Sequence, residues 1–241
     1  MTASIRPARP WSEIDTWVFD LDNTLYPASC NLFAEVDQRM TGYISNLLGL
    51  SPDEATALRR RYYLEHGTTL SGLMRHHTVD PHEFLTMVHD LDYSPVSANP
   101  RLDAALANLP GRKIVFTNGT TAHAEAVLNR LGVPHHFEAI FDVVAADFVP
   151  KPQPEPYAKF LRTHGVQAGS AAMLEDMAKN LLQPHALGMT TIWLRGEHAW
   201  SDGEAAAEED QSHIHHIADD IADFLESVLA DLTDKPAPAP G

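Results

Sequence analysis

The sequence predicts an α/β fold: a doubly wound parallel sheet with a helical domain inserted after the first strand. Two observations carry this prediction. Short apolar runs alternate along the chain with helical patterns that end at glycine, an alternation typical of a parallel sheet covered by helices. The first two apolar runs are also about ninety residues apart, which is far more than a crossover connection needs.

Five apolar runs are predicted to be the strands of the sheet. Each is too short for an independent helix, and most are followed by polar or turn-forming residues, as expected of buried strands. They are residues 17–19, 114–116, 140–141, 172–174 and 190–194.

Three helical patterns between the later strands support the doubly wound arrangement. Each is followed directly by a glycine, which takes the left-handed conformation without a Cβ penalty and so ends a helix. The three patterns are residues 122–131, 155–164 and 178–187.

The segment between the first two strands is predicted to form a helical cap. Ser51 and Glu54 fit a capping box, with Pro52 at the first helical position. Helical spacing occurs in residues 31–48, 55–65, 70–76 and 81–89. The predicted organisation is therefore a core of residues 1–27 and 97–232, a cap of residues 28–96, a solvated acidic segment at 204–210 and a disordered tail at 233–241.

Composition limits the partners of the chain. The 241 residues carry 17 Lys and Arg against 33 Asp and Glu, a net charge of −16, which disfavours nucleic acid and anionic membranes. The single cysteine, Cys30, cannot form an internal disulfide, and no run reaches the roughly 20 apolar residues of a membrane span. We therefore expect a cytoplasmic, soluble monomer or homodimer.

The 14 histidines include several close neighbours. None of these clusters has the separated ligand pairs of a structural zinc site, so we interpret them as ordinary loop or helix-surface histidines. They are His76 with His77, His135 with His136, and His213 with His215 and His216.

Two aspartates follow the first predicted strand. Asp20 should project from the carboxyl end of the sheet, where α/β folds bind ligands, and Asp22 is close enough to share its site. Their repulsion is relieved by a cation or a proton. One can then act as nucleophile while the other protonates a leaving oxygen. By itself, an Asp-x-Asp segment also fits a solvated turn.

Thr117, Asn118 and Gly119 follow the second predicted strand. A hydroxyl, an amide and exposed backbone N–H groups at this position can bind phosphoryl oxygens, and Gly119 allows the backbone to approach closely. The same residues also fit an ordinary Asn-Gly turn with Thr120 as the helix cap.

Lys151 lies between prolines, and Glu175 and Asp176 follow the fourth predicted strand. Lys151 could offset the charge of a nucleophile and a phosphate, or could be an exposed loop lysine, while the two acids could simply cap a helix. Magnesium prefers oxygen ligands, so Asp20, Asp22 and Asp176 would suffice to bind it. The four groups in order, each after a strand, favour a site for phosphoryl transfer.

Together, residues 20–24 (DLDNT), Thr117 with Asn118, Lys151, and Glu175 with Asp176 resemble the four ordered motifs of the haloacid dehalogenase-like superfamily. The resemblance implies a Rossmann-like core with a helical cap between the first two motifs. It also implies that Asp20 attacks phosphorus in line, while Asp22 protonates the leaving oxygen and then activates water.

The resemblance further implies roles for the remaining motif residues. Phosphate and nucleophile would be positioned by Thr24, Thr117, Asn118, Gly119 and Lys151. Mg²⁺ would be bound by Asp20, the backbone carbonyl of Asp22, and Asp176, with Glu175 as a direct or outer-shell helper.

Within this superfamily the chain is similar to the pyrimidine 5′-nucleotidase branch from about residue 17 to residue 229. Ser71 departs from the pattern, because some members of the branch carry a basic residue there. The similar segments are FDLDNTLYP (19–27), YY (62–63), GTTL (67–70), GL (72–73), FTNGTTAH (116–123) and EDMAKNL (175–181).

The leading hypothesis is therefore a magnesium-dependent phosphomonoesterase that forms a phosphoaspartate and hydrolyses a pyrimidine nucleoside 5′-monophosphate such as UMP or CMP. The alternatives are a phosphatase or phosphomutase acting on a sugar phosphate or phosphoglycolate, and a non-catalytic ligand sensor. A carbon–halogen hydrolase is a further alternative, but such enzymes generally lack the second aspartate, so Asp22 argues against it.

Overall fold

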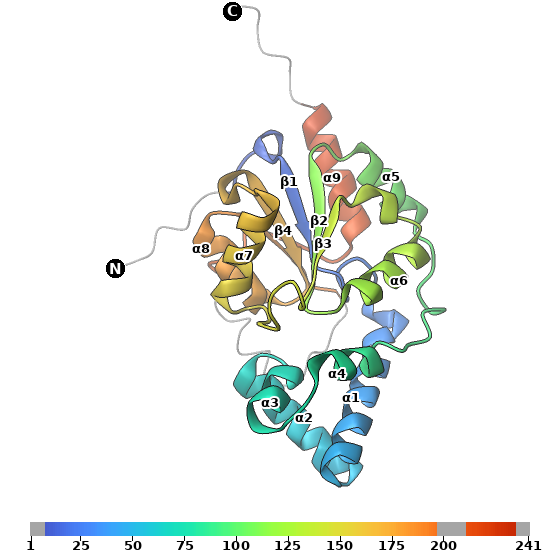
Figure 1. The fold of residues 1–241 in the computed structure, drawn as a ribbon. Helices are drawn as coiled ribbons and strands as arrows, with labels where there is room; N and C mark the ends of the chain where they lie inside the picture. Colours follow the sequence, from blue (N-terminus) through green and yellow to red (C-terminus); the bar gives the residue numbers. More distant parts are fainter. Residues whose placement is uncertain (1–7, 197–210, 235–241) are drawn as a thin grey trace, which may run out of the picture.

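A computed structural model describes residues 8–196 and 211–234 (Figure 1). At its centre is a six-stranded sheet of order β3-β2-β1-β4-β5-β6, in which every neighbouring pair is parallel. The predicted α/β class is confirmed. The strands are β1 (Thr16–Phe19), β2 (Arg112–Phe116), β3 (Ala139–Phe141), β4 (Ala171–Glu175), β5 (Thr190–Leu194) and β6 (His216–Ala218).

The order of the strands reverses at β1. Val18 on this strand is in register with Ile114 on β2 and with Met173 on β4. The chain therefore builds outward to β2 and β3 on one side of β1, and to β4, β5 and β6 on the other. Sheets of this order bind ligands at the carboxyl ends of the strands, where the direction of winding changes.

Helices cover both faces of the sheet (Figure 1). Trp17 and Phe19 pack in one apolar cluster with α5, α6 and α9, while Val18 packs in another that includes residues of α7, as the alternation of side chains along a strand requires. The α-helices of this part of the fold are α5 (Pro100–Asn108), α6 (Thr121–Leu131), α7 (Pro154–His164), α8 (Leu182–Leu187) and α9 (Ile221–Thr233). Short 3₁₀ helices are η1 (Trp11–Glu13), η2 (Ala28–Cys30), η3 (Pro134–His136), η4 (Ala168–Ser170) and η5 (Ala178–Leu181).

Four of the five α-helices between β1 and β2 lie beyond the carboxyl ends of the strands (Figure 1). They share an apolar cluster that includes Ile44, Leu73 and Phe84. The predicted capping box is present, since the Ser51 hydroxyl accepts from the Glu54 backbone N–H and the Glu54 carboxylate accepts from the Ser51 N–H. The four helices are α1 (Leu32–Leu48), α2 (Pro52–His66), α3 (Thr69–His76) and α4 (Pro81–Val88).

Two elements differ from the sequence prediction. Residues 178–187 are not one helix: the first four form η5, and only Leu182–Leu187 is α-helical. The reason is local, because the Asn180 side chain and backbone carbonyl are engaged by Glu175 and Tyr157. Glu175 itself is the last residue of β4 rather than the first residue after it.

The sixth strand was not predicted. It contains His216, one of the histidines expected in a loop or on a helix surface. His213, just before the strand, is buried with Nε2 2.8 Å from the Ala178 carbonyl oxygen. Helix α9 includes Thr233, the first residue of the predicted tail; the rest of that tail from residue 235 and the acidic segment 204–210 lie outside the described residues. No helix in the described parts of the chain is long and apolar enough to cross a membrane.

Candidate active site

The predicted site residues come together at the carboxyl ends of three strands. Asp20 follows β1, Thr117 follows β2, and Glu175 and Asp176 stand at the end of β4. The Asp20 backbone N–H donates to the Leu174 carbonyl at 3.0 Å. Asp20 is therefore held against β4 even though it lies beyond the last residue of its own strand.

Lys151 is buried at the centre of this group, with only 1% of its side chain exposed. Its Nζ donates to Asp20 Oδ1 at 2.7 Å, to Glu175 Oε2 at 2.9 Å and to the Phe116 carbonyl at 2.9 Å, which uses all three donors of an ammonium group. Burial alone would lower the pKa of Lys151, but the charges of Asp20 and Glu175 raise it above its ordinary value. The lysine is thus a fixed positive charge beside Asp20.

Thr24 and Asn118 complete the support of this ion pair. The Thr24 hydroxyl donates to Asp20 Oδ2 at 3.0 Å, so both carboxylate oxygens of Asp20 are engaged. Asn118 accepts from the Lys151 backbone N–H at 2.9 Å and donates to the Lys151 carbonyl at 3.3 Å. Asn118 therefore holds the lysine loop against the end of β2. The Gly119 backbone N–H donates to the Thr117 hydroxyl at 2.8 Å.

Asp22 is held through one of its two carboxylate oxygens. The Tyr26 hydroxyl donates to Oδ1 at 2.7 Å, and Nε2 of His123 lies 2.7 Å from the same atom. Oδ2 has no hydrogen-bond partner among the described residues and lies 3.7 Å from the position that a β-carbon on Gly119 would take. Asp22 and Gly119 both line the cavity. Burial raises the pKa of Asp22, but the charge and hydrogen bond of His123, with the Tyr26 bond, outweigh it and lower that pKa to about 2.

His123, Tyr93 and His89 are site residues that sequence reasoning missed. His123 is 1% exposed, its Nδ1 lies 3.0 Å from the Tyr93 hydroxyl, and its ring stacks on that of His89 with centroids 4.5 Å apart. The Tyr93 hydroxyl also donates to the His89 carbonyl at 3.0 Å. The only signal in the sequence was the place of His123 at the end of the FTNGTTAH segment; its partners Tyr93 and Asp22 are 30 and 101 residues away.

Three buried carboxylates form an oxygen-rich cluster. Asp20, Glu175 and Asp176 each offer an oxygen within 4.8 Å of the others. Burial raises the pKa of Asp176 well above its ordinary value, and the negative charges of Glu175 and Asp20 raise it further. Asn180 Oδ1 is also buried without a hydrogen-bond partner. A hard divalent cation, which prefers oxygen ligands, fits this donor set and its excess of negative charge. The Asp22 side chain is not in the cluster, because it faces Tyr26 and His123.

A cavity of about 450 Å³ connects these groups to the four inserted helices, a volume within the usual range for small-molecule sites. Lys179, beyond β4, donates to the Tyr63 hydroxyl on α2 and lies 4.1 Å from the centre of its ring. Arg59, on the same helix, pairs with Asp37 on α1. The inserted helices contribute apolar side chains together with the cations Arg59 and Arg60. Their part of the lining includes Phe33, Met40, Arg59, Arg60, Tyr63, Phe84, Leu85 and Val88.

Two known proteins are similar to this chain over part of their length. The chain is 28% identical over 193 residues to Phosphate metabolism protein 8 of Saccharomyces cerevisiae, covering 71% of this chain and 58% of that protein. It is 32% identical over 125 residues to Fructose-1-phosphate phosphatase YqaB of Escherichia coli, covering 48% and 64%. The chain thus spans about three fifths of the length of these relatives.

The fold and the family follow from two further matches. A crystal structure of a phosphatase of the haloacid dehalogenase (HAD) type from Thermococcus onnurineus matches with a TM-score of 0.59 at 17% identity, over 90% of this chain and 99% of that one. A family model described as haloacid dehalogenase-like hydrolase matches residues 14–182. This match extends from just before β1 to beyond the acidic end of β4. The chain therefore belongs to the haloacid dehalogenase-like hydrolase family.

Proposed function

We propose that the protein is a magnesium-dependent phosphomonoester hydrolase that forms an aspartyl-phosphate on Asp20 and hydrolyses a pyrimidine nucleoside 5′-monophosphate such as UMP or CMP. One observation carries the proposal: Asp20 borders the cavity, held by Lys151 and Thr24 and flanked by the acidic cluster. The phosphatase named among the relatives supports a phosphate-ester substrate.

In this proposal, Asp20 is the nucleophile. Lys151 and Thr24 hold its carboxylate in one orientation, and the lysine charge favours the ionised form. An oxygen of Asp20 attacks phosphorus in line and forms an O–P bond as the bond to the leaving oxygen breaks. Phosphoryl transfer depends chiefly on positioning and on charge stabilisation, which a buried ion pair of this kind can supply.

Asp22 is the proposed acid and base. Its unpartnered Oδ2 borders the cavity, so it can protonate the leaving oxygen and later take a proton from the water that attacks the phosphoaspartate. A bound phosphate dianion adds negative charge beside Asp22 and raises its pKa, which favours the protonated form for the first step. Tyr26 and His123 act as positioning residues through Oδ1.

The proposed magnesium ligands are Asp20, Asp176 and the backbone carbonyl of Asp22, with Glu175 as a direct or outer-shell helper. The oxygen-only donor set and the buried negative charge of the cluster support this assignment. When bound, the ion would offset the negative charge of the phosphate and the nucleophile.

The phosphate is proposed to bind at the ends of β1 and β2. Thr117 and Gly119 border the cavity, and Asn118 would act by holding the backbone of Lys151. Residues 28–96 are proposed to act as a cap that selects the leaving group. The aromatic and cationic side chains that α1 and α2 contribute to the cavity support a flat, polar leaving group such as a nucleoside.

The remaining alternatives concern the leaving group and its acceptor. A sugar phosphate or phosphoglycolate would use the same catalytic residues, and a phosphomutase would transfer the phosphate to a sugar rather than to water. Cytoplasmic location and a monomeric or homodimeric state remain predictions.

Asp20→Asn tests the central claim. Phosphate release from UMP, CMP, fructose 1-phosphate and phosphoglycolate is measured with and without Mg²⁺ for the wild type and the variant. We expect the variant to lose activity by about 10⁴-fold or more, with unchanged circular dichroism. Retained magnesium-dependent turnover in Asp20→Asn would refute the nucleophile. Preference for a sugar phosphate would instead refute only the nucleotide substrate.

A further inference from the structure

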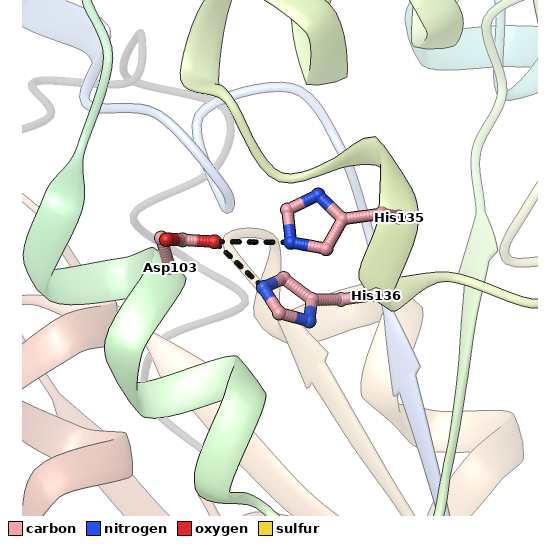
Figure 2. Close-up of side chains that lie close together, drawn as sticks. All are labelled: Asp103, His135 and His136. Atoms are coloured by element: carbon pink, nitrogen blue, oxygen red, sulfur yellow. Dashed lines mark hydrogen bonds and ion pairs between the residues drawn. The ribbon is translucent and has the colours of Figure 1, made fainter.

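A second group of metal-ligating side chains lies outside the cavity (Figure 2). Asp103 is on α5, and His135 and His136 are in the 3₁₀ helix η3. Nε2 of His136 is 2.7 Å from Asp103 Oδ1, and Nε2 of His135 is 3.4 Å from the same oxygen. In the described parts of the chain, this is one of two groups in which three such side chains converge.

We propose that Asp103, His135 and His136 bind a divalent transition-metal ion such as Zn²⁺. Two imidazole nitrogens and one carboxylate oxygen suit zinc, cobalt or nickel, whereas magnesium prefers oxygen alone. The proposed site is therefore chemically distinct from the all-oxygen cluster around Asp20.

The distances are close to those of a metal site. Ligands about 2.0–2.2 Å from a tetrahedral zinc ion are about 3.4 Å apart, and the His135 and Asp103 atoms have this separation. The shorter contact between His136 and Asp103 is a direct hydrogen bond. Binding would require the carboxylate to withdraw by less than about 1 Å, and the Asp103 side chain, 46% exposed, has room to turn.

An ordinary ion pair explains only part of this arrangement. Successive side chains of a 3₁₀ helix point about 120° apart, yet both Nε2 atoms face the same carboxylate, and the two ring centroids are 4.0 Å apart (Figure 2). His136 by itself would satisfy the hydrogen bond. His135 brings a second imidazole nitrogen within 3.4 Å of the same oxygen, and in the proposed site a cation would take a lone pair from each ring.

The burial of the three residues indicates which kind of site this is. His136 is only 11% exposed and so is fixed by its surroundings, while 62% of His135 is exposed. Three protein ligands with an open side leave the fourth position of a tetrahedral ion to water. Because Asp103 and His136 are 33 residues apart in the chain, a bound ion would cross-link α5 to η3.

Isothermal titration of the full chain with ZnCl₂ tests the proposal, with saturating Mg²⁺ present to compete at the acidic cluster. The wild type should bind one more zinc ion than His135→Ala/His136→Ala. Asp103→Asn, which keeps both histidines, should bind that ion about tenfold more weakly or worse, since even indirect metal partners contribute this much. His76→Ala/His77→Ala removes a different adjacent histidine pair and should match the wild type.

Two further readouts separate this site from the proposed active site. Zinc should raise the melting temperature of the wild type more than that of His135→Ala/His136→Ala, while both should hydrolyse substrate equally with Mg²⁺. Equal zinc stoichiometry and affinity in the wild type and His135→Ala/His136→Ala would overturn the proposal. So would loss of the ion in His76→Ala/His77→Ala.

Discussion

The two partners of Asp22 act on the same atom. Tyr26 and His123 both contact Oδ1, and Tyr93 contacts the far side of the His123 ring. The carboxylate therefore cannot rotate without breaking two short contacts, and Oδ2 keeps its position at the cavity. Catalytic groups that are misplaced by 1 Å can lose about 10²-fold in rate, so this network should matter for turnover.

Replacing His123 tests this positioning role. We expect His123→Ala to lower kcat by about 10²-fold with little change in KM, because the substrate does not need His123 to bind. His123→Gln, which keeps a polar group near Asp22, should recover part of the loss. Steady-state kinetics on the best phosphate ester gives both constants. Equal kcat in His123→Ala and the wild type would contradict the role.

The environment of His89 predicts a dependence of stability on pH. Burial, followed by repulsion from His123, lowers the pKa of His89 to about 3. The folded protein therefore keeps His89 neutral, while the unfolded chain binds a proton below pH of about 6.5. The unfolded state binds more protons between these values, so stability falls as the pH falls, by up to about 1.4 kcal/mol per pH unit.

Urea unfolding at several pH values from 7 down to 4.5 checks this expectation. His89→Gln should lose free energy of unfolding less steeply with acidification than the wild type. The control is His82→Gln on α4, the helix that ends just before His89; His82 is exposed, and the variant should follow the wild type. Parallel curves for all three proteins would rule out His89 as the source.

At the level of elements, α2 and α3 meet at Gly72. A β-carbon at this position would lie 2.3 Å from Cγ and 2.4 Å from Cβ of Tyr62. Such contacts are not reached without moving one helix. The Tyr62 hydroxyl also lies 2.8 Å from Nε2 of His77, the residue that follows the C-terminal end of α3. The glycine therefore sets the distance between two helices that border the cavity.

Gly72→Ala should destabilise the protein by about 1–3 kcal/mol, the usual cost of overpacking. Gly42→Ala provides the matched control: Gly42 lies within α1, and a β-carbon there meets nothing within 4 Å. That variant should gain about 0.5–1 kcal/mol from helix propensity. Chemical denaturation measures both. A Gly72→Ala protein as stable as Gly42→Ala would show that α3 shifts freely.

Across the whole molecule, negative charge is in excess both overall and at the site. The chain carries a net charge of −16, and Lys151 is the cation in contact with the cluster of Asp20, Glu175 and Asp176. Because the folded-state pKa of Asp176 lies above its ordinary value, this group destabilises the metal-free fold at neutral pH. A bound cation would remove that cost.

Asp176→Asn should therefore have two opposite effects. Without metal, the variant should melt at a higher temperature than the wild type. With Mg²⁺, only the wild type should be stabilised further, by about 2.7 kcal/mol when the ion is at 100 times its Kd. Thermal melts with EDTA and with increasing MgCl₂ measure this. An equal Mg²⁺ response in both proteins would exclude Asp176 as a ligand.

Much of the fold was predictable because its signals are local. The buried runs at β1, β2, β4 and β5 and the capping box at Ser51 depend on neighbouring residues alone, and all were found at or near the predicted positions. Strand β6 was missed because its three residues include a histidine and show no apolar run. It is a strand because β5 offers an open edge for it to pair with.

The sequence by itself determined the order of the chemical groups: Asp20, Thr117, Lys151 and Asp176 each follow a strand or its loop, and parallel strands bring such ends to one edge of a sheet. Only the tertiary structure decided what surrounds them. His123 contacts Asp22, and Asp103 contacts His136. Lys151 donates all three of its hydrogen bonds to groups within the site. These contacts join residues 24 to 131 positions apart, and no local pattern encodes which distant side chains will meet.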